Sequence, residues 1–441
     1  MIGNGPSRFG CLQTVSYHPA YRSKNPGEGK RLKVFISAGE VSGDVIGARL
    51  AAEIWKRLPD ACVFGVGGCR MEAAGVTIDY GTNHLGTVGI TEPFFAIPAF
   101  ARALRKIRAR VRRDPPDVAV LIGNDIFNVL LGRWLRARGV PTVSYFPPQV
   151  WIWRSLARLF VGSYDAILTS FPEEQKIYEK TGKPARFVGH YLCETLRPAG
   201  PGERISARAR LGLDKTATII GLMPGSRLHE VRRLAPILLD AAILLTQRHP
   251  GAAFVLPVAE RVYFEKISRL IEQRGLADRV HLTSNDPGAI SACDLVLLAS
   301  GTASLEAALL GVPMVIIYRV SAFTMWVVRT AIRLGLMDSE TMGLPNLVLG
   351  RMVVPELRQE QLSVTAVVAQ ASRLLEDPQA VAETRLALAE VRSLLRQEDV
   401  VGAVAESVLE SVSRPTASGS PAKRLAPAGS GKFPRAAKEK G

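Results

Sequence analysis

Short runs of Val, Ile and Leu alternate with longer amphipathic stretches through most of this chain. In the first half the apolar runs are residues 33–37, 118–122, 142–145 and 166–169, and amphipathic stretches lie near 45–57 and 126–138. A second series begins at residue 217 and continues through residues 254–256, 280–282, 295–298 and 314–318. Continuous apolar strands separated by helices are typical of parallel sheets covered on both faces. The pattern predicts an α/β fold with two Rossmann-like domains and a cleft between them, where ligands bind at the carboxyl ends of the strands.

Both ends of the chain break this pattern. Residues 1–31 and 413–441 are rich in Gly, Pro, Ser and basic residues without a sustained period, which predicts a disordered extension and a disordered basic tail. The Pro and Gly residues of 196–215 are typical of a joint. We therefore predict an N-terminal domain over 32–198. A C-terminal domain would cover 199–412, and its final helices could cross back onto the first.

Composition limits the kinds of partner. The net charge of +16 arises from 56 Lys and Arg against 40 Asp and Glu, and predicts an anionic partner such as nucleic acid, acidic lipid or a phosphorylated substrate. The five scattered cysteines lack CxxC spacing, so neither a disulfide framework nor a zinc site is indicated, and a reducing cytoplasm fits best. No apolar run approaches the ~20 residues that span a bilayer. The sequence therefore predicts a soluble or peripheral protein.

Two loops of small residues in the second half predict a binding site for the diphosphate group of a nucleotide. Each follows an apolar strand and precedes a helix, which brings free N–H groups to a helix N-terminus without need of a metal. The residues concerned are Gly225, Ser226, Ser300, Gly301 and Thr302. Arg227 can pair with a phosphate, and Glu306, four residues after Thr302, can accept hydrogen bonds from a ribose diol. The alternatives are a surface arginine and an ordinary capped turn.

A third loop follows the first strand of the chain. It combines two glycines, a hydroxyl and two carboxylates at the carboxyl end of a strand: Gly39, Glu40, Ser42, Gly43 and Asp44. A substrate could meet these groups there. The spacing is neither GxGxxG nor a P-loop, so no dinucleotide or other cofactor is indicated. The alternative is a tight turn in which Ser42 or Asp44 caps the following helix.

Aromatic and basic residues supply two further hypotheses. Residues 145–154, with Trp153, form either a pocket wall or a packed corner, and His190 after a later strand is either a structural donor or a binding residue. Residues 92–100 form an apolar wedge that runs into a basic helix. The members are Phe94, Phe95, Phe100, Arg102, Arg105 and Lys106. This composition predicts contact with an anionic membrane, and the alternative is a core-facing stripe with a solvated basic face. Nucleic acid is disfavoured because no nucleic-acid module is present.

Several of these motifs together resemble lipid-A-disaccharide synthases, inverting glycosyltransferases of the GT-B fold, over residues 32–405. The resemblance is carried by residues 38–44, 65–71, 88–92, 150–154, 187–190, 224–227, 299–306, 318–319 and 344–347. It implies transfer of a 2,3-diacylglucosamine from UDP to the 6-hydroxyl of 2,3-diacylglucosamine 1-phosphate, giving a β-1,6-linked disaccharide 1-phosphate and UDP. It also implies peripheral attachment to the cytoplasmic face of the inner membrane and self-association into a homo-oligomer. Further binding residues by this resemblance are Asn128, Trp153, Tyr318, Arg319 and Asn346.

One motif departs from the family pattern. The family strand near residue 120 ends in Asp-Ala-Pro-Asp-Phe-Asn, whose first Asp is regarded as important for catalysis. Aligned on Phe127 and Asn128, the two family carboxylates fall on Gly123 and Ile126. We therefore predict Asp125 as the first choice for the base that takes the acceptor proton.

Other assignments stay open at this point. Glu40 and Asp44 are alternatives for the base, and Arg227 would stabilise the leaving diphosphate. A related enzyme with a different lipid or sugar acceptor is also compatible with the sequence, as is a protein that binds UDP-sugar or lipid without turnover.

Overall fold

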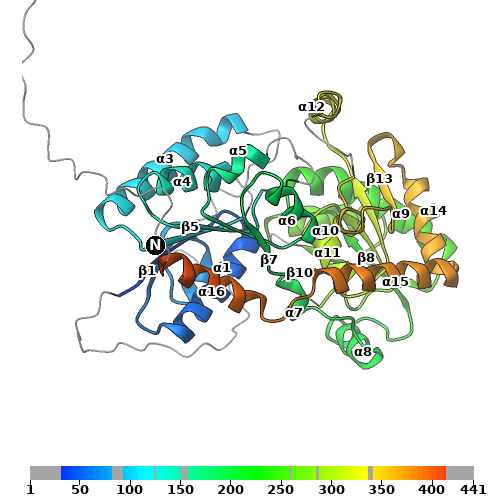
Figure 1. Cartoon of the computed structure of the whole chain (residues 1–441). Helices are drawn as coiled ribbons and strands as arrows, with labels where there is room; N and C mark the ends of the chain where they lie inside the picture. Colours follow the sequence, from blue (N-terminus) through cyan, green and yellow to red (C-terminus); the bar gives the residue numbers. More distant parts are fainter. Residues whose placement is uncertain are drawn as a thin grey trace, which may run out of the picture.

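The computed structural model describes residues 31–81, 93–123, 126–148, 150, 157–258, 261–284, 288–335 and 341–413. Its two halves each contain a parallel sheet covered by helices, and Figure 1 shows them side by side. The predicted α/β class with two Rossmann-like sheets is therefore confirmed. Among the described residues, no helix is long and apolar enough to cross a membrane.

The first sheet has seven strands in the order β3-β2-β1-β4-β5-β6-β7, and every neighbouring pair is parallel. The strands are β1 (Lys33–Ala38), β2 (Cys62–Gly67), β3 (Thr77–Gly81), β4 (Val118–Ile122), β5 (Thr142–Tyr145), β6 (Ala166–Thr169) and β7 (Ala185–Phe187). The helices are α1 (Val41–Arg57), α2 (Cys69–Ala73), α3 (Pro93–Arg113), α4 (Ile126–Arg136), α5 (Ala157–Val161), α6 (Pro172–Glu179) and α7 (Leu192–Thr195). The order reverses between β1 and β4, which is where such sheets open a binding crevice.

The second sheet has six parallel strands in the order β10-β9-β8-β11-β12-β13. The strands are β8 (Thr218–Met223), β9 (Ala252–Val258), β10 (Val280–Ser284), β11 (Leu295–Ala299), β12 (Met314–Tyr318) and β13 (Glu356–Arg358). The helices are α8 (Pro201–Arg210), α9 (Leu228–Arg248), α10 (Phe264–Glu272), α11 (Thr302–Leu309), α12 (Ala322–Arg333), α13 (Leu344–Leu349), α14 (Val364–Glu376), α15 (Pro378–Leu395) and α16 (Val400–Ser413), with 3-10 turns η3 (Arg261–Tyr263) and η4 (Gln359–Gln361).

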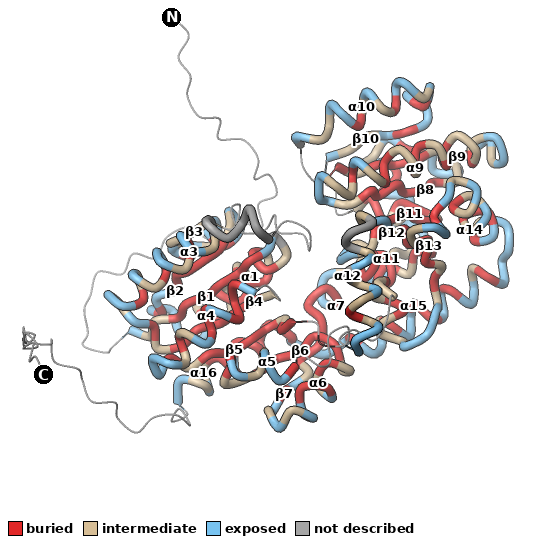
Figure 2. The backbone as a smooth tube through the Cα atoms, turned by 90° about the horizontal axis from the view of Figure 1, so that it is seen from above, coloured by how far each residue is buried: buried red, intermediate tan, exposed pale blue. Residues whose placement is uncertain are grey.

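Alternate residues of the second sheet belong to two different hydrophobic cores, as the period of two along a strand requires. On β11, Val296 and Leu298 join a core that continues into the first half, whereas Leu295 and Leu297 face the core under α9 and α14. Figure 2 shows the buried strands of both sheets as continuous red tubes between exposed helices. The two halves therefore share apolar packing through one face of the second sheet.

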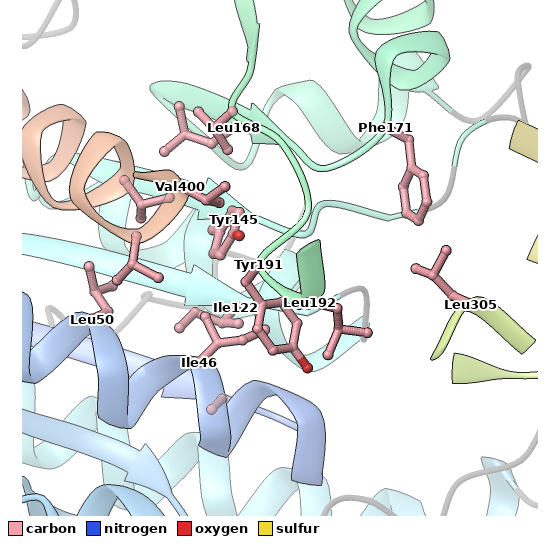
Figure 3. Packing of buried hydrophobic residues seen from close by; sticks show 14 of the residues in the cluster. Ile46, Leu50, Ile122, Tyr145, Leu168, Phe171, Tyr191, Leu192, Leu305 and Val400 are labelled. Carbon is pink, nitrogen blue, oxygen red and sulfur yellow. The ribbon is translucent and has the colours of Figure 1, made fainter. Parts of the chain in front are cut away.

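The last helix returns to the first half of the molecule. In Figure 1, α16 lies over the first sheet, and it packs against α1, β4, β5 and β6. Val400 begins the helix beside Tyr145 and Leu50 in Figure 3, and its backbone N–H donates to Oε1 of Glu194 at 2.7 Å. Residues 400–413 therefore pack with the first sheet, although they follow the second in sequence. The predicted boundary near residue 198 stays a prediction.

Arg392, near the end of α15, forms stabilising hydrogen bonds where the two halves of the molecule meet. Its guanidinium donates hydrogen bonds to the carbonyls of Cys193 and Leu196 in the joint and of Leu309 on α11. Three residues further on, the carbonyl of Leu395 accepts from the backbone N–H of His190 at 3.0 Å. These bonds hold the end of α15 against the loop that follows β7.

We expect Arg392→Leu to lower the free energy of unfolding by about 2 kcal/mol, because hydrogen bonds from a charged donor to three carbonyls are lost. The measurement is a chemical denaturation midpoint followed by circular dichroism. Arg385→Leu, on an exposed position of the same helix, is the matched control and should shift the midpoint little. Equal midpoints for the two variants would show that Arg392 does not fasten the joint.

Candidate functional site

A pocket of about 690 Å³, part of it open to solvent, lies where the two halves meet. Its first wall is the start of α1 and the loops that follow β4, β5, β6 and β7. Thr302, Leu305 and Leu344 of the second half form the opposite wall. In Figure 3, Leu305 points from α11 toward Phe171 and Leu192 of the first half. The pocket therefore lies at the carboxyl ends of strands, as predicted.

The loop after β1 brings three predicted residues into this pocket. Glu40, Ser42 and Gly43 all line it, and the side chain of Glu40 is exposed. A Cβ atom at Gly43 would lie 3.3 Å from Cβ of Ala38, so glycine lets α1 start close to the end of β1 without crowding this neighbour. Gly39 is buried behind them and does not line the pocket.

Asp44 has a structural role in place of the predicted catalytic one. Its side chain is 3% exposed, and its carboxylate accepts from the backbone N–H groups of Gly68 at 2.6 Å, Arg70 at 3.0 Å and Met71 at 3.1 Å. The carboxylate thus caps the N-terminus of α2, where a negative charge is favoured. The sequence-based alternative, a cap on the helix that contains Asp44, is also wrong, because the capped helix begins 25 residues later.

Two predicted asparagines are likewise buried and structural. Asn128 accepts from Oγ of Ser37 at 2.6 Å and donates to the carbonyl of Ile122 at 2.9 Å, which ties the ends of β1 and β4 together. Asn346 accepts from the backbone N–H of Val353 at 2.7 Å and donates to Glu356 at 2.8 Å, which ties α13 to β13. Neither side chain lines the pocket. Both stabilise the elements that shape it.

His190 lies in the pocket inside an aromatic cluster. Its ring centroid is 5.1 Å from that of Phe146, 5.5 Å from Phe171 and 5.2 Å from Tyr191. Burial lowers the pKa of His190 to about 3, so the imidazole is neutral at physiological pH. Nδ1 accepts from the backbone N–H of Leu192 at 3.3 Å, which leaves the ring proton on Nε2 as a donor.

The nucleotide loops meet because β8, β11 and β12 are neighbours, so their carboxyl ends share one edge. Gly225 has a φ of +103°, and a Cβ there would lie 2.3 Å from Oε2 of Glu230, so glycine is required. Arg227 is 54% exposed beside Glu230, with 3.4 Å between Nη1 and Oε1. Ser226 and Gly301 are exposed or half-buried, and Oγ of Ser300 donates to the carbonyl of Met342 at 2.7 Å.

The remaining predicted residues of the second half surround these loops. Burial raises the pKa of Glu306, which has no hydrogen-bond or ion-pair partner among the described residues. The pKa of Tyr191 is raised to about 12, first by burial and then by the charge of Glu306. Burial, followed by the charge of Glu230, raises the pKa of Tyr318, and Arg319 is exposed.

Some predicted residues cannot be placed. Asp125 and Trp153 lie outside the described residues, and the side chains of Phe94 and Phe95 on the first turn of α3 are not described. Gly123, at the family's carboxylate position, does line the pocket. Among the described residues, no group of three or more His, Cys, Asp or Glu is arranged to hold a metal.

The C-terminal part of α3 agrees with the alternative to membrane contact, which is a core-facing stripe with a solvated basic face. Ala103, Ile107 and Val111 are buried, and Phe100 packs against Phe127 with 5.9 Å between ring centroids, so Phe100 faces the core. The predicted contact of Phe100 with a membrane stays a prediction, although this half-buried ring packs on the core. Arg102, Arg105 and Lys106 are exposed on the other face, and Nζ of Lys106 lies 5.8 Å from the Tyr80 ring.

Glu174 is a pocket residue that no motif in the sequence singles out. This residue on the first turn of α6 lines the pocket and is 2% exposed. A glutamate that follows Pro172 and Glu173 looks like an ordinary helix start, where acidic residues are common. No sequence signal distinguishes Glu174 from its exposed neighbour, so only the fold could find it.

A family model described as lipid-A-disaccharide synthetase matches residues 34–408. The chain belongs to the lipid-A-disaccharide synthase family. The curated lipid-A-disaccharide synthase of Geobacter sulfurreducens is 38% identical over 384 residues, which covers 86% of this chain and 97% of the relative. That of Pseudomonas aeruginosa is 38% identical over 384 residues, covering 87% and 99%. That of Myxococcus xanthus is 35% identical over 379 residues, covering 86% and 97%. Membership makes the chain a glycosyltransferase of lipid A biosynthesis.

Solved structures agree with the fold. A UDP-GlcNAc 2-epimerase from Neisseria meningitidis bound to UDP-GlcNAc matches with a TM-score of 0.58 and 13% identity, covering 86% of this chain and 98% of that one. The MurG protein of Acinetobacter baumannii matches with a TM-score of 0.51 and 13% identity, covering 86% and 99%. These similarities confirm the GT-B-like fold of this lipid-A-disaccharide synthase family member and carry no further conclusion about its chemistry.

We expect Asp44→Asn to destabilise the protein by about 1–2 kcal/mol, because an amide replaces a charged acceptor of three N–H bonds. Turnover of the folded variant should stay within about threefold of the parent protein. The measurements are a thermal melt and steady-state kinetics, with the exposed Asp60→Asn as control. A folded Asp44→Asn protein that has lost turnover a hundredfold would restore the catalytic assignment.

Proposed function

We propose that the chain transfers 2,3-diacylglucosamine from its UDP derivative to the 6-hydroxyl of 2,3-diacylglucosamine 1-phosphate. The products are a β-1,6-linked disaccharide 1-phosphate and UDP. The match to the family over residues 34–408 carries this proposal. The pocket supports it, because carboxylate-bearing loops of the first half face the start of α11 in the second half.

The proposed mechanism is a direct displacement with inversion. The acceptor hydroxyl attacks the anomeric carbon, the bond to the diphosphate breaks, and a carboxylate takes the hydroxyl proton. Asp125 remains the first candidate for this base and Glu40, which lines the pocket, the second. The departing diphosphate would be stabilised by Arg227 and by the N–H groups at the starts of α9 and α11, without a metal.

One observation favours two alternative functions. Gly123 stands in the pocket where the family pattern has its carboxylate. A related enzyme with a different acceptor, or a protein that binds UDP-sugar or lipid without turnover, would tolerate this change.

The test is a turnover assay of the full chain with UDP-diacylglucosamine and diacylglucosamine 1-phosphate in detergent, reading UDP and lipid product together. Disaccharide phosphate supports the proposal. UDP-sugar binding without product supports the non-turnover alternative, and product formation only with other acceptors supports the related enzyme.

In this assay we expect Arg227→Ala to lower kcat/KM for the UDP-sugar by about 10- to 100-fold, because a charged hydrogen bond to the diphosphate is lost. Arg232→Ala, exposed on the first turns of α9, is the matched control and should stay within about twofold. Equal kinetics of the two variants would remove Arg227 from the nucleotide site.

We also propose that the exposed basic face of α3 and α4 binds the anionic cytoplasmic face of the membrane. Arg138, Arg108 and Arg112 lie 4.0, 5.5 and 6.0 Å from the ring centroid of Trp134, and none has an acidic partner within the described part of the chain. Burial, followed by the charges of Arg112 and Arg108, lowers the pKa of Arg138. Three guanidinium groups around the Trp134 ring, without acidic partners among the described residues, favour binding of the phosphates of lipid headgroups.

Exposed apolar side chains near α12 support the same proposal. Trp326 is 63% exposed and Leu334 is 68% exposed. In Figure 1, α12 and α3 both lie along the upper edge of the molecule. Apolar side chains beside cations are typical of segments that lie in a membrane interface. Self-association into a homo-oligomer stays a prediction from the family resemblance.

We expect the triple variant Arg108→Gln, Arg112→Gln, Arg138→Gln to bind vesicles of phosphatidylglycerol and phosphatidylethanolamine on the order of 100-fold more weakly, at about 1 kcal/mol per cation. The measurement is vesicle co-sedimentation at low and high salt. A triple variant at the exposed Arg210, Arg232 and Arg385 has the same net charge and should bind far better. Equal loss in both triples would mean that net charge alone drives binding.

A further inference from the structure

Glu174 is a buried carboxyl group whose side chain has no partner in the described part of the chain. It lies on the first turn of α6, lines the pocket and is 2% exposed. Its side chain has no hydrogen bond or ion pair with any of the residues that the structure describes. Buried carboxyl groups are normally paired or hydrogen-bonded, because the cost of leaving them unpaired is high. An unpaired carboxyl on a pocket wall therefore indicates a partner that binds in the pocket.

The described pocket lining around Glu174 contains no cation that would favour its charged form. No Lys or Arg lines the pocket among the described residues. Of the elements packed against α6, α5 carries Arg158 and β7 carries Arg186, both exposed, and β6 has no charged residue. Glu173, next in the chain, pairs with Lys176 at 3.3 Å on the surface.

The polar neighbours of Glu174 are uncharged at neutral pH. Tyr178, one turn along α6, uses its hydroxyl to donate to the carbonyl of Pro148 at 2.7 Å. His190 in the same pocket is a neutral imidazole with its proton on Nε2. Burial raises the pKa of Glu174 well above its ordinary value. Burial therefore favours the neutral form of the carboxyl group, and this form has an O–H to donate.

We propose that Glu174 is a specificity-determining residue of the acceptor side of the pocket, where its protonated carboxyl donates a hydrogen bond to an uncharged oxygen of the acylated sugar acceptor. This rests on the proposed function. An uncharged oxygen, a hydroxyl or an acyl carbonyl, fits because the described pocket wall offers no cation to a phosphate. The acceptor is favoured over the UDP-sugar because α6 belongs to the first half, whereas the nucleotide loops belong to the second.

The test uses two variants with opposite hydrogen-bonding properties. Glu174→Gln keeps the shape and a donor, so we expect it to raise KM for the acceptor by no more than about threefold. Glu174→Leu removes the donor, so KM for the acceptor should rise about tenfold or more, with KM for the UDP-sugar unchanged. Glu173→Gln is the matched control with kinetics like the parent protein.

A loss of kcat in Glu174→Gln as large as in Glu174→Leu would overturn the proposal and indicate an ionised carboxylate. Unchanged acceptor KM in Glu174→Leu would also overturn it.

The pH dependence of the melting temperature tests, without any substrate, whether the buried carboxyl group of Glu174 is neutral. The pKa of Glu174 is higher in the folded than in the unfolded protein, so its stabilising contribution is present below the unfolded value near 4.5 and is lost as the pH rises toward the folded value. Glu174→Gln cannot ionise, so its melting temperature relative to the parent protein should increase from pH 4 to pH 8. A difference independent of pH would overturn the assignment.

Direct binding separates this inference from the proposed function. Diacylglucosamine 1-phosphate in detergent is titrated into the parent protein and Glu174→Leu in the absence of UDP-sugar. Binding that Glu174→Leu weakens about tenfold, without any turnover by the parent protein, keeps the inference and removes the proposed function. Normal turnover with equal binding by both proteins removes the inference and keeps the function.

Discussion

The site depends on the return of the chain from the second sheet to the first. The end of α15 is fixed by Arg392, whose guanidinium reaches carbonyls in both the joint and α11, and by the bond from His190 to Leu395. From there α16 covers β4, β5 and β6. Because the carboxyl ends of both sheets then face one pocket, small residues at α11 meet carboxylates at α1 and α6. Without this crossing, neither half would hold a complete site.

Burial and pairing assign different tasks to three carboxyl groups of the first half. Asp44 is buried and bound by three N–H groups, so its charge stabilises α2. Glu40 is exposed at the pocket and free to meet a substrate proton. Glu174 is buried there and has no partner among the residues that the structure describes, and this burial disfavours its charge. Three acidic residues near one pocket thus differ in chemistry because their surroundings differ.

The sequence predicts the strands that are long and wholly apolar, because a buried parallel strand needs such a run. It misses β3 and β13, which are short and partly exposed edge strands with charged residues. It also misses the buried β2, in which Gly65 interrupts the apolar run. The pocket-lining loop after β1 was predictable, since glycines and carboxylates at a strand end leave a local signal. The roles of Asn128 and Glu174 were not, because each depends on neighbours far away in sequence, such as Ser37, 91 residues before Asn128.

At Gly123, where the family pattern has a carboxylate, the backbone conformation restricts the residue type more than the space available for a side chain does. A Cβ atom built there would meet nothing within 4 Å, so a side chain has room. The φ of +101°, however, is a conformation that L-residues other than glycine adopt only with strain. A carboxylate at this position would therefore cost stability that the present loop avoids. The open space at Gly123 lies in the same pocket as Glu40 and Glu174. Under the proposed function a substrate oxygen occupies it, with the base supplied by Asp125 or Glu40 and a hydrogen bond donated by Glu174.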